Sequence, residues 1–289
     1  MRLDDEREST NFEIQDGRGG LGGGLGGGLG LLLPLIGSRF GCGGIVVVLI
    51  IMAVMGVNPL SLIGGGGQMP QGGEVSRDSS RLSDVQHWSL KVLGSTERVW
   101  GSLFQQAGQQ YQPTVLSFYS QNGSSGCGAA QSAMGPFYCP NDRKVYLDTD
   151  FFTELRQRFG APGDFAQAYV IAHEVGHHVQ DLEGTLGEVN QKQRAVSEAQ
   201  GNALQVRVEL QADCYAGVWA KRTGLMEPGD LEEGMKAAQA IGDDTLQKAA
   251  GRRPVPESFT HGTSEQRMTW LRKGLDSGDP AQCDTFKGA

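Results

Sequence analysis

The chain has little positive charge, and its few cations form no basic stripe. Its 289 residues include 25 Lys and Arg against 33 Asp and Glu, for a net charge of −8. A nucleic-acid partner needs clustered cations that replace the counterions of its phosphates, so we expect no such partner. The glycine-rich run at residues 17–30 lacks the Gly-Lys-Ser/Thr ending of a phosphate-binding loop, and this excludes that reading of the glycines.

Cysteine is also scarce, and no Cys-x-x-Cys spacing is present, which argues against a thiolate metal site. Four of the five cysteines follow the long apolar run near the N-terminus, and an even number in an oxidising compartment predicts two disulfides. Three connectivities are possible. We favour Cys127 with Cys139, because the short loop between them contains Gly135-Pro136, and then Cys214 with Cys283 by elimination.

Charged residues are absent from Phe40 to beyond Ile63, and Ile45 to Val57 is unbroken apolar sequence. About 20 apolar residues span a bilayer, so residues 41–63 are predicted to form one transmembrane helix. Arg39 precedes this run and no Lys or Arg follows it until Arg77, which favours a cytoplasmic N-terminus and a soluble domain in the periplasm or outside the cell. The predicted organisation is a charged, then Gly/Leu-rich segment (1–40), the membrane helix (41–63), a flexible linker (64–80) and one compact domain (81–289).

The most informative motif is His173-Glu174-Val175-Gly176-His177. On a helix, the spacing turns both imidazoles to one face, where both can reach one metal ion. Helix-forming and apolar residues precede the motif and support that helix. Chance occurrence on an amphipathic helix is the alternative, because the pattern fixes only three residues, and a third ligand downstream would decide against it.

Glu209 and Asp213 are the candidates for that third ligand and for a hydrogen-bond partner of a ligand histidine. They lie four residues apart in a segment with helical periodicity from about Val196 to Ala220. We assign Glu209 as the third ligand and Asp213 as the hydrogen-bond partner of a ligand histidine. The alternative is a solvated acidic helix face, which the apolar neighbours make less favourable.

Two histidines and one glutamate leave the fourth position of a tetrahedral zinc site open for water, as in catalytic sites. We expect one Zn²⁺ per chain, with Glu174 as the general base that takes a proton from this water and passes it to a leaving amine. The chemistry indicates metal-assisted hydrolysis of an amide bond in a protein or peptide. Two alternatives stay open: a zinc-stabilised adaptor that binds an envelope partner, and a hydrolase of a non-peptide amide.

These motifs resemble those of the bacterial neutral zinc metallopeptidases, a gluzincin-type family. The resemblance extends over nearly the whole chain. It rests on three motifs in the same order, His173 to His178, Glu209 to Gly217 and Thr260 to Arg267. It implies His173, His177 and Glu209 as ligands, Glu174 as a catalytic residue and a membrane-bound protein.

The remaining histidines are harder to assign. His261 follows a proline-containing loop and precedes a helix that Thr263 or Ser264 would cap. In related gluzincins a late histidine approaches the site and stabilises an oxyanion, so His261 is either catalytic or an ordinary loop residue. His178 points about 100° away from its neighbour on a helix and is predicted to be structural or to support a ligand residue, and His87 is predicted to be structural.

The expected fold is α+β: a mainly helical, zincin-like domain with a small β-sheet. Helices are predicted at Gln86 to Ala107 and Leu231 to Ala250 besides the two metal-bearing segments, and a short strand at Lys144 to Asp148. In a zincin-like fold this strand would be the edge that an extended peptide joins.

Overall fold

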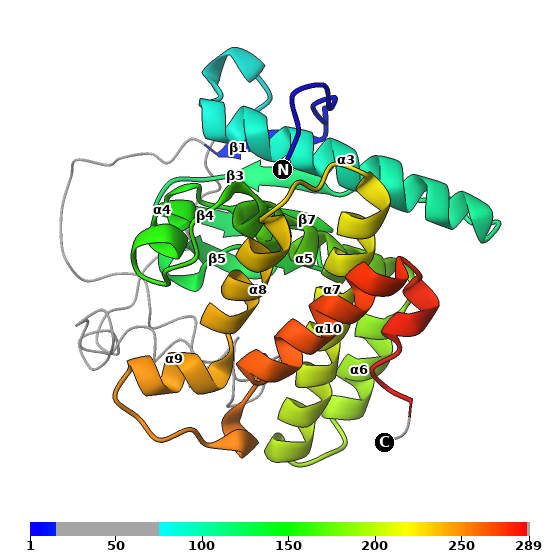
Figure 1. The fold of residues 1–289 in the computed structure, drawn as a ribbon. Helices are drawn as coiled ribbons and strands as arrows, with labels where there is room; N and C mark the ends of the chain where they lie inside the picture. The colour runs from blue at the N-terminus through cyan, green and yellow to red at the C-terminus, as the bar shows by residue number, and fades with distance from the viewer. Residues whose placement is uncertain (16–74, 288–289) are drawn as a thin grey trace.

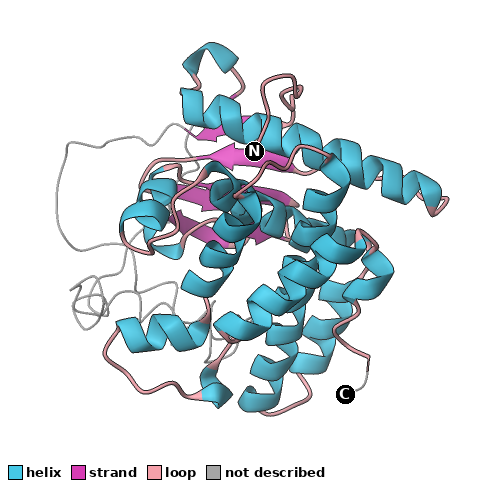
Figure 2. Ribbon diagram, viewed as in Figure 1, coloured by secondary structure: helices cyan, strands magenta, loops and turns pink. Residues whose placement is uncertain are grey.

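A computed structural model describes residues 1–15 and 75–287. Helices dominate, and a small sheet lies toward one end of them (Figures 1 and 2). The α+β, mainly helical fold is therefore confirmed. The helices are α3 (Asp84–Gln106), α4 (Asp150–Gln157), α5 (Asp164–Leu182), α6 (Thr185–Gln193), α7 (Glu198–Thr223), α8 (Asp230–Ala240), α9 (Asp243–Ala249) and α10 (Ser264–Ser277).

The main sheet has five strands in the order β2-β1-β3-β7-β6, and β4 and β5 form a separate hairpin. β1 is parallel to β3 and β3 to β7, whereas β2 and β6 are antiparallel to their neighbours. The strands are β1 (Phe12–Gln15), β2 (Val75–Ser76), β3 (Val115–Phe118), β4 (Asn122–Ser125), β5 (Gly128–Gln131), β6 (Phe137–Cys139) and β7 (Lys144–Leu147).

β7 forms where a strand was expected, but it lies inside the sheet. It pairs with β3 on one side and with β6 on the other. The prediction that this strand is the edge was therefore wrong, because an alternating apolar pattern reports a strand and does not report its neighbours. The edge strand at this end of the sheet is β6.

The segment predicted as one helix from Leu231 to Ala250 is two helices, α8 and α9, separated at Ile241 and Gly242. The break has a packing cause. A Cβ on Gly242 would lie 2.4 Å from the backbone nitrogen of Ser264, so the chain turns there against the start of α10. The turn also carries Asp243 toward the loop before α10, where its carboxylate accepts backbone hydrogen bonds.

Residues 1–15 belong to the folded domain, although the boundary predicted at residue 81 did not include them. β1 is an inner strand of the sheet, and Met1, Leu3 and Phe12 are buried in the hydrophobic core. The Met1 ammonium lies 2.8 Å from an Asp164 oxygen at the start of α5 and 3.1 Å from an Asp230 oxygen. The polar composition of this stretch hid its role, since a short strand needs few apolar residues.

A fragment that begins at residue 75 is expected to be strongly destabilised. It lacks β1, which leaves the hydrogen-bonding groups of β3 unpaired on one side and removes Phe12 from the core. Thermal unfolding of residues 75–289 would measure the loss. A synthetic peptide of residues 1–15 should raise the midpoint when added in excess, and a scrambled peptide should not. A midpoint equal to that of the full chain would show that β1 is dispensable.

Among the described residues, no helix is both long and apolar enough to cross a membrane. The predicted transmembrane helix at 41–63 lies outside the described residues, as do most of the Gly/Leu-rich segment and the predicted linker. The end of that linker, residues 75–80, is described. It contains β2 and the start of a short 3-10 turn at Ser79–Arg81.

Candidate metal centre

Helix α5 carries the first motif and is buried along most of its length. His173 is 6% exposed to solvent and Glu174 is 8% exposed. Gly176 lies between the two motif histidines and faces α7, where a Cβ would come within 3.0 Å of the Ala212 carbonyl oxygen. Glycine therefore allows α5 and α7 to approach closely, and this approach brings the histidines to the carboxylate on α7.

That carboxylate belongs to Glu209. One of its oxygens lies 3.2 Å from His173 Nε2 and 3.6 Å from His177 Nε2. One ligand atom from each of the three residues lies within 4.8 Å of the others. Two neutral imidazole nitrogens and a carboxylate oxygen are a donor set that suits zinc. The three residues that the sequence suggested as ligands are thus brought to one point.

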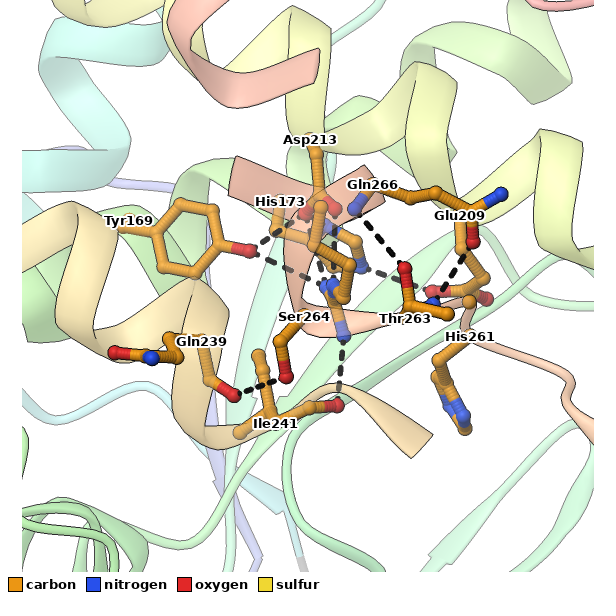
Figure 3. A network of polar contacts seen from close by, with 12 residues as sticks. Tyr169, His173, Glu209, Asp213, Gln239, Ile241, His261, Thr263, Ser264 and Gln266 are labelled. Atoms are coloured by element: carbon orange, nitrogen blue, oxygen red, sulfur yellow. Dashed lines mark hydrogen bonds and ion pairs between the residues drawn. The ribbon is translucent and has the colours of Figure 1, made fainter. Parts of the chain in front are cut away.

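The other nitrogen of His173 faces Asp213, as Figure 3 shows. Nδ1 is 2.8 Å from Oδ1 of Asp213, and Arg267 from α10 donates to both oxygens of that carboxylate at 2.9 Å. Tyr169 donates its hydroxyl to the same carboxylate at 2.6 Å. Burial alone would raise the pKa of Asp213, but Arg267 and His173 outweigh it and lower the pKa to about 2. Asp213 is therefore held as an anion that orients the His173 ring.

The other nitrogen of His177 has a neutral partner. Nδ1 lies 2.9 Å from the side-chain oxygen of Gln180, which is fully buried one turn later on α5. Nδ1 of His173 lies beside a carboxylate and Nδ1 of His177 bonds to an amide oxygen, and the Nε2 atoms of both rings face Glu209. The residues present therefore fit a metal ion with respect to donor type, tautomer and orientation.

Glu174 lies in the same cavity as the three candidate ligands but is not grouped with them. Burial raises the pKa of Glu174, while the two motif histidines and a hydrogen bond from the Tyr138 backbone oppose that shift. A carboxylate whose pKa is raised toward neutrality is better matched to accepting and returning a proton.

His261 faces this cavity from the loop before α10 and is oriented by Asp243. Its Nδ1 lies 3.3 Å from Oδ1 of Asp243. The other oxygen of Asp243 accepts backbone hydrogen bonds from Thr260, His261 and Gly262, which fixes the loop. Burial lowers the pKa of His261, but Glu209 and Asp243 outweigh it and the net shift is upward. His261 is thus a positioned hydrogen-bond donor at the cavity wall.

His178 takes no part in this group. Its Nε2 lies 2.6 Å from the Gln112 carbonyl oxygen and its Nδ1 3.1 Å from the Tyr138 hydroxyl. Both contacts tie α5 to the segments beside the sheet, in agreement with the structural role expected for it. His87 pairs with Glu8 of the N-terminal segment, 2.9 Å away, and does not line the cavity.

The cavity has a volume of about 700 Å³. Edge strand β6 forms part of its wall, together with apolar side chains such as Phe151, Val170 and Leu246. The Cys127–Cys139 disulfide fixes the end of β6 to the tip of the β4–β5 hairpin, and the second disulfide joins Cys214 to Cys283. Both predicted disulfides are thereby confirmed.

The sequence comparisons give this geometry a family. A model described as "Putative neutral zinc metallopeptidase" matches residues 1–286. The chain belongs to this family. The match includes residues 1–15, in keeping with their place in the sheet. Membership in a zinc metallopeptidase family implies zinc and a protein or peptide substrate, and it confirms the family resemblance of the sequence motifs.

Relatives of this chain occur in Escherichia coli and Mycobacterium tuberculosis. The uncharacterized protein YpfJ of Escherichia coli strain K12 is 46% identical over 295 residues, which cover 99% of each chain. The uncharacterized protein Rv2575 of Mycobacterium tuberculosis strain H37Rv is 43% identical over 227 residues, 73% of each chain. No solved structure matches the chain.

Four residues around the cavity escaped the sequence reasoning: Asp243, Gln180, Arg267 and Tyr138. Three of them are contributed by elements distant from their partners in sequence, so no spacing rule identifies them. Gln180 is the exception. It follows His177 by three residues on one helix, and that spacing alone would place the two side chains together.

Proposed function

We propose that this chain is a zinc-dependent peptidase of the gluzincin type, in which His173, His177 and Glu209 hold one zinc ion. The observation that carries the proposal is the convergence of their three ligand atoms within 4.8 Å in a cavity that also holds Glu174. Zinc bound there would lower the pKa of a coordinated water toward about 7 and polarise a substrate carbonyl.

The chain's own residues supply the proton transfers and the charge stabilisation. Glu174, whose pKa is raised by burial, accepts a proton from the attacking water and returns it to the leaving amine. His261, oriented by Asp243, donates a hydrogen bond to the oxygen of the tetrahedral intermediate. Asp213 and Gln180 hold the ligand rings and do not touch the substrate.

In this proposal the substrate binds along edge strand β6. This strand pairs with β7 on one side only within the described part of the sheet, and its residues form the cavity wall. An extended peptide can therefore bind through backbone hydrogen bonds, with its side chains directed alternately toward and away from the apolar pocket. We propose that the domain acts on polypeptides at a membrane, to which residues 41–63 would attach it.

The test uses the purified full chain in detergent. We expect about one zinc per chain and chelator-sensitive cleavage of an unfolded protein, restored by added zinc. Zinc binding without cleavage of any polypeptide would favour the adaptor or the non-peptide amide hydrolase. Absence of zinc binding would contradict the proposal at its basis.

His261→Ala is expected to lower kcat by about 10²- to 10³-fold with little change in zinc content, the range typical for loss of one oxyanion donor. Steady-state kinetics together with metal analysis would check this. His87→Ala is the matched control, because it removes the same side chain at a site paired only with Glu8. Equal kinetics for the two variants would return His261 to the role of a loop residue.

A further inference from the structure

A chain of buried amides connects candidate ligand His177 to a disulfide. Gln180 receives the Nδ1 hydrogen of His177 at its side-chain oxygen, and its nitrogen donates to the Val208 carbonyl at 2.8 Å and to the side-chain oxygen of Gln211 at 2.9 Å. Every polar atom of this side chain is thus engaged. Because both amide hydrogens have acceptors, the oxygen is the atom that must face His177.

Gln211 continues the connection to the C-terminal segment. Its nitrogen donates to the carbonyl oxygen of Cys283 at 3.2 Å, and Cys283 is disulfide-bonded to Cys214 on α7. Gln211 is 7% exposed and Cys283 is fully buried. The disulfide therefore holds the Cys283 carbonyl, which is the last acceptor in this series of hydrogen bonds. It attaches that acceptor to α7, the helix that carries Glu209.

The two candidate ligand histidines are supported by different chemistry. His173 is oriented by the carboxylate of Asp213, which a buried arginine neutralises. Asp213 directly precedes Cys214, but its side chain contacts Tyr169, His173 and Arg267 and not the C-terminal segment. His177 depends on neutral hydrogen bonds, which are weaker and more sensitive to displacement of any member. Loss of the Cys214–Cys283 bond would free the Cys283 carbonyl that accepts from Gln211, whereas the Asp213 carboxylate would still be held by Arg267 of α10.

We propose that Gln180 and Gln211 are positioning residues for His177, and that the Cys214–Cys283 disulfide tunes zinc affinity through them. The inference rests on the proposed function, because it needs zinc at the three ligands. Reduction of this bond to two thiols, by an external dithiol that is itself oxidised to a disulfide, should weaken zinc binding. The oxidised state is then the tight-binding state.

Zinc affinity of the full chain, measured by chelator competition, tests the role of Gln180 and Gln211. Gln180→Leu should weaken binding by about 10- to 100-fold, the usual range for removing a partner of a ligand histidine. Gln180→Glu keeps an oxygen facing His177 but places its other oxygen against the Val208 carbonyl and the Gln211 side-chain oxygen, so it should also bind zinc more weakly than the wild type. Unchanged affinity in Gln180→Leu would overturn the proposal. The melting temperature of the metal-free variants separates weaker binding from loss of fold.

The two disulfides provide a matched pair for the second part. The double variant Cys214→Ser, Cys283→Ser should bind zinc several-fold more weakly, whereas Cys127→Ser, Cys139→Ser should bind it as tightly as the wild type. Equal losses in both would mean that the disulfides act only on general stability and would overturn the proposal. Failure of the wild type to bind zinc would refute the proposed function instead, so the two failures are distinguishable.

A second inference follows from strand pairing. Ile14 and Gln15 of β1 pair with Ser76 and Val75 of β2, and β1 also pairs with β3. Residues 16–74, which contain the predicted membrane span, therefore leave and rejoin the domain at adjacent positions. One crossing of a membrane between those positions would place β1 and β3 on opposite sides, which the pairing does not allow.

We propose that residues 1–15 and 75–287 lie on the same side of the membrane. This proposal differs from the orientation expected from sequence, with a cytoplasmic N-terminus and an external domain, and it requires that residues 41–63 attach the domain to the membrane without a net crossing. Buried contacts support the shared location, because Glu13 is 3% exposed and its carboxylate lies 2.8 Å from Lys144 of β7. The two disulfides favour the oxidising side for both parts.

Labelling with a membrane-impermeant maleimide tests the inference in cells that express the full chain with Cys42→Ser. Asp5→Cys and Glu265→Cys introduce thiols at exposed positions of the two parts. Both should label in intact cells, and both should label after lysis as the control for access. Labelling of one in intact cells and of the other only after lysis would overturn the proposal.

Discussion

Glu174→Gln is expected to lower kcat by about 10²- to 10⁴-fold, the usual contribution of a general base, while zinc content stays at the wild-type level. Glutamine has nearly the same shape and can keep the hydrogen bond from the Tyr138 backbone, but it cannot accept the proton. Because Glu174 is not grouped with the three candidate ligands, its loss should leave their ligand atoms in place.

Steady-state kinetics on an unfolded protein substrate, with metal analysis of the same sample, would measure both quantities. Glu188→Gln is the matched control, because Glu188 is exposed on the neighbouring helix α6 and lies outside the cavity. Turnover by Glu174→Gln near the wild-type rate would refute the assignment of the base. Loss of zinc in that variant would instead show that Glu174 supports the metal centre.

The sequence was sufficient to predict the residues whose relation is helical. His173 and His177 share a face because the repeat of the helix requires it, and Glu209 and Asp213 share one for the same reason. Their meeting across α5 and α7 needed one further assumption, that the two motifs bind one ion. The disulfides followed from their number and from one loop.

Contacts between distant segments were beyond sequence reasoning. Asp243 reaches His261 only because the helix expected from Leu231 to Ala250 breaks at Gly242, and that break depends on packing against α10. β1 escaped for a different reason. Its four residues contain only two apolar side chains, and its stability comes from strands far along the chain that pair with both of its edges.

Two different factors therefore determine the site: local sequence motifs and packing between distant segments. The spacing of the motifs selects the ligand types, whereas α10 and the C-terminal segment fix the ligand orientations through Arg267 and Cys283. A Cβ on Gly274 of α10 would lie 1.9 Å from the Cys214 carbonyl oxygen, so a glycine is required for this support to reach α7.

Glu209→Ala is expected to abolish stoichiometric zinc binding and, with it, hydrolysis. Its carboxylate is the only acid grouped with the two histidines among the described residues, and two imidazoles alone bind zinc weakly. Metal analysis after dialysis against a weak chelator would show the loss. Glu198→Gln, at an exposed position in the first turn of the same helix, should retain its zinc.

A comparison with Gln205 distinguishes a metal ligand from a residue that only contacts the ligand. Gln205 donates to the other oxygen of Glu209 at 3.1 Å, so Gln205→Ala should weaken zinc binding without abolishing it. A graded series of wild type, Gln205→Ala and Glu209→Ala would place the carboxylate in direct contact with the ion. Unchanged stoichiometry in Glu209→Ala would move the third ligand elsewhere, and His261 would then be the residue to replace next, because it lines the same cavity and carries a nitrogen that can bind zinc.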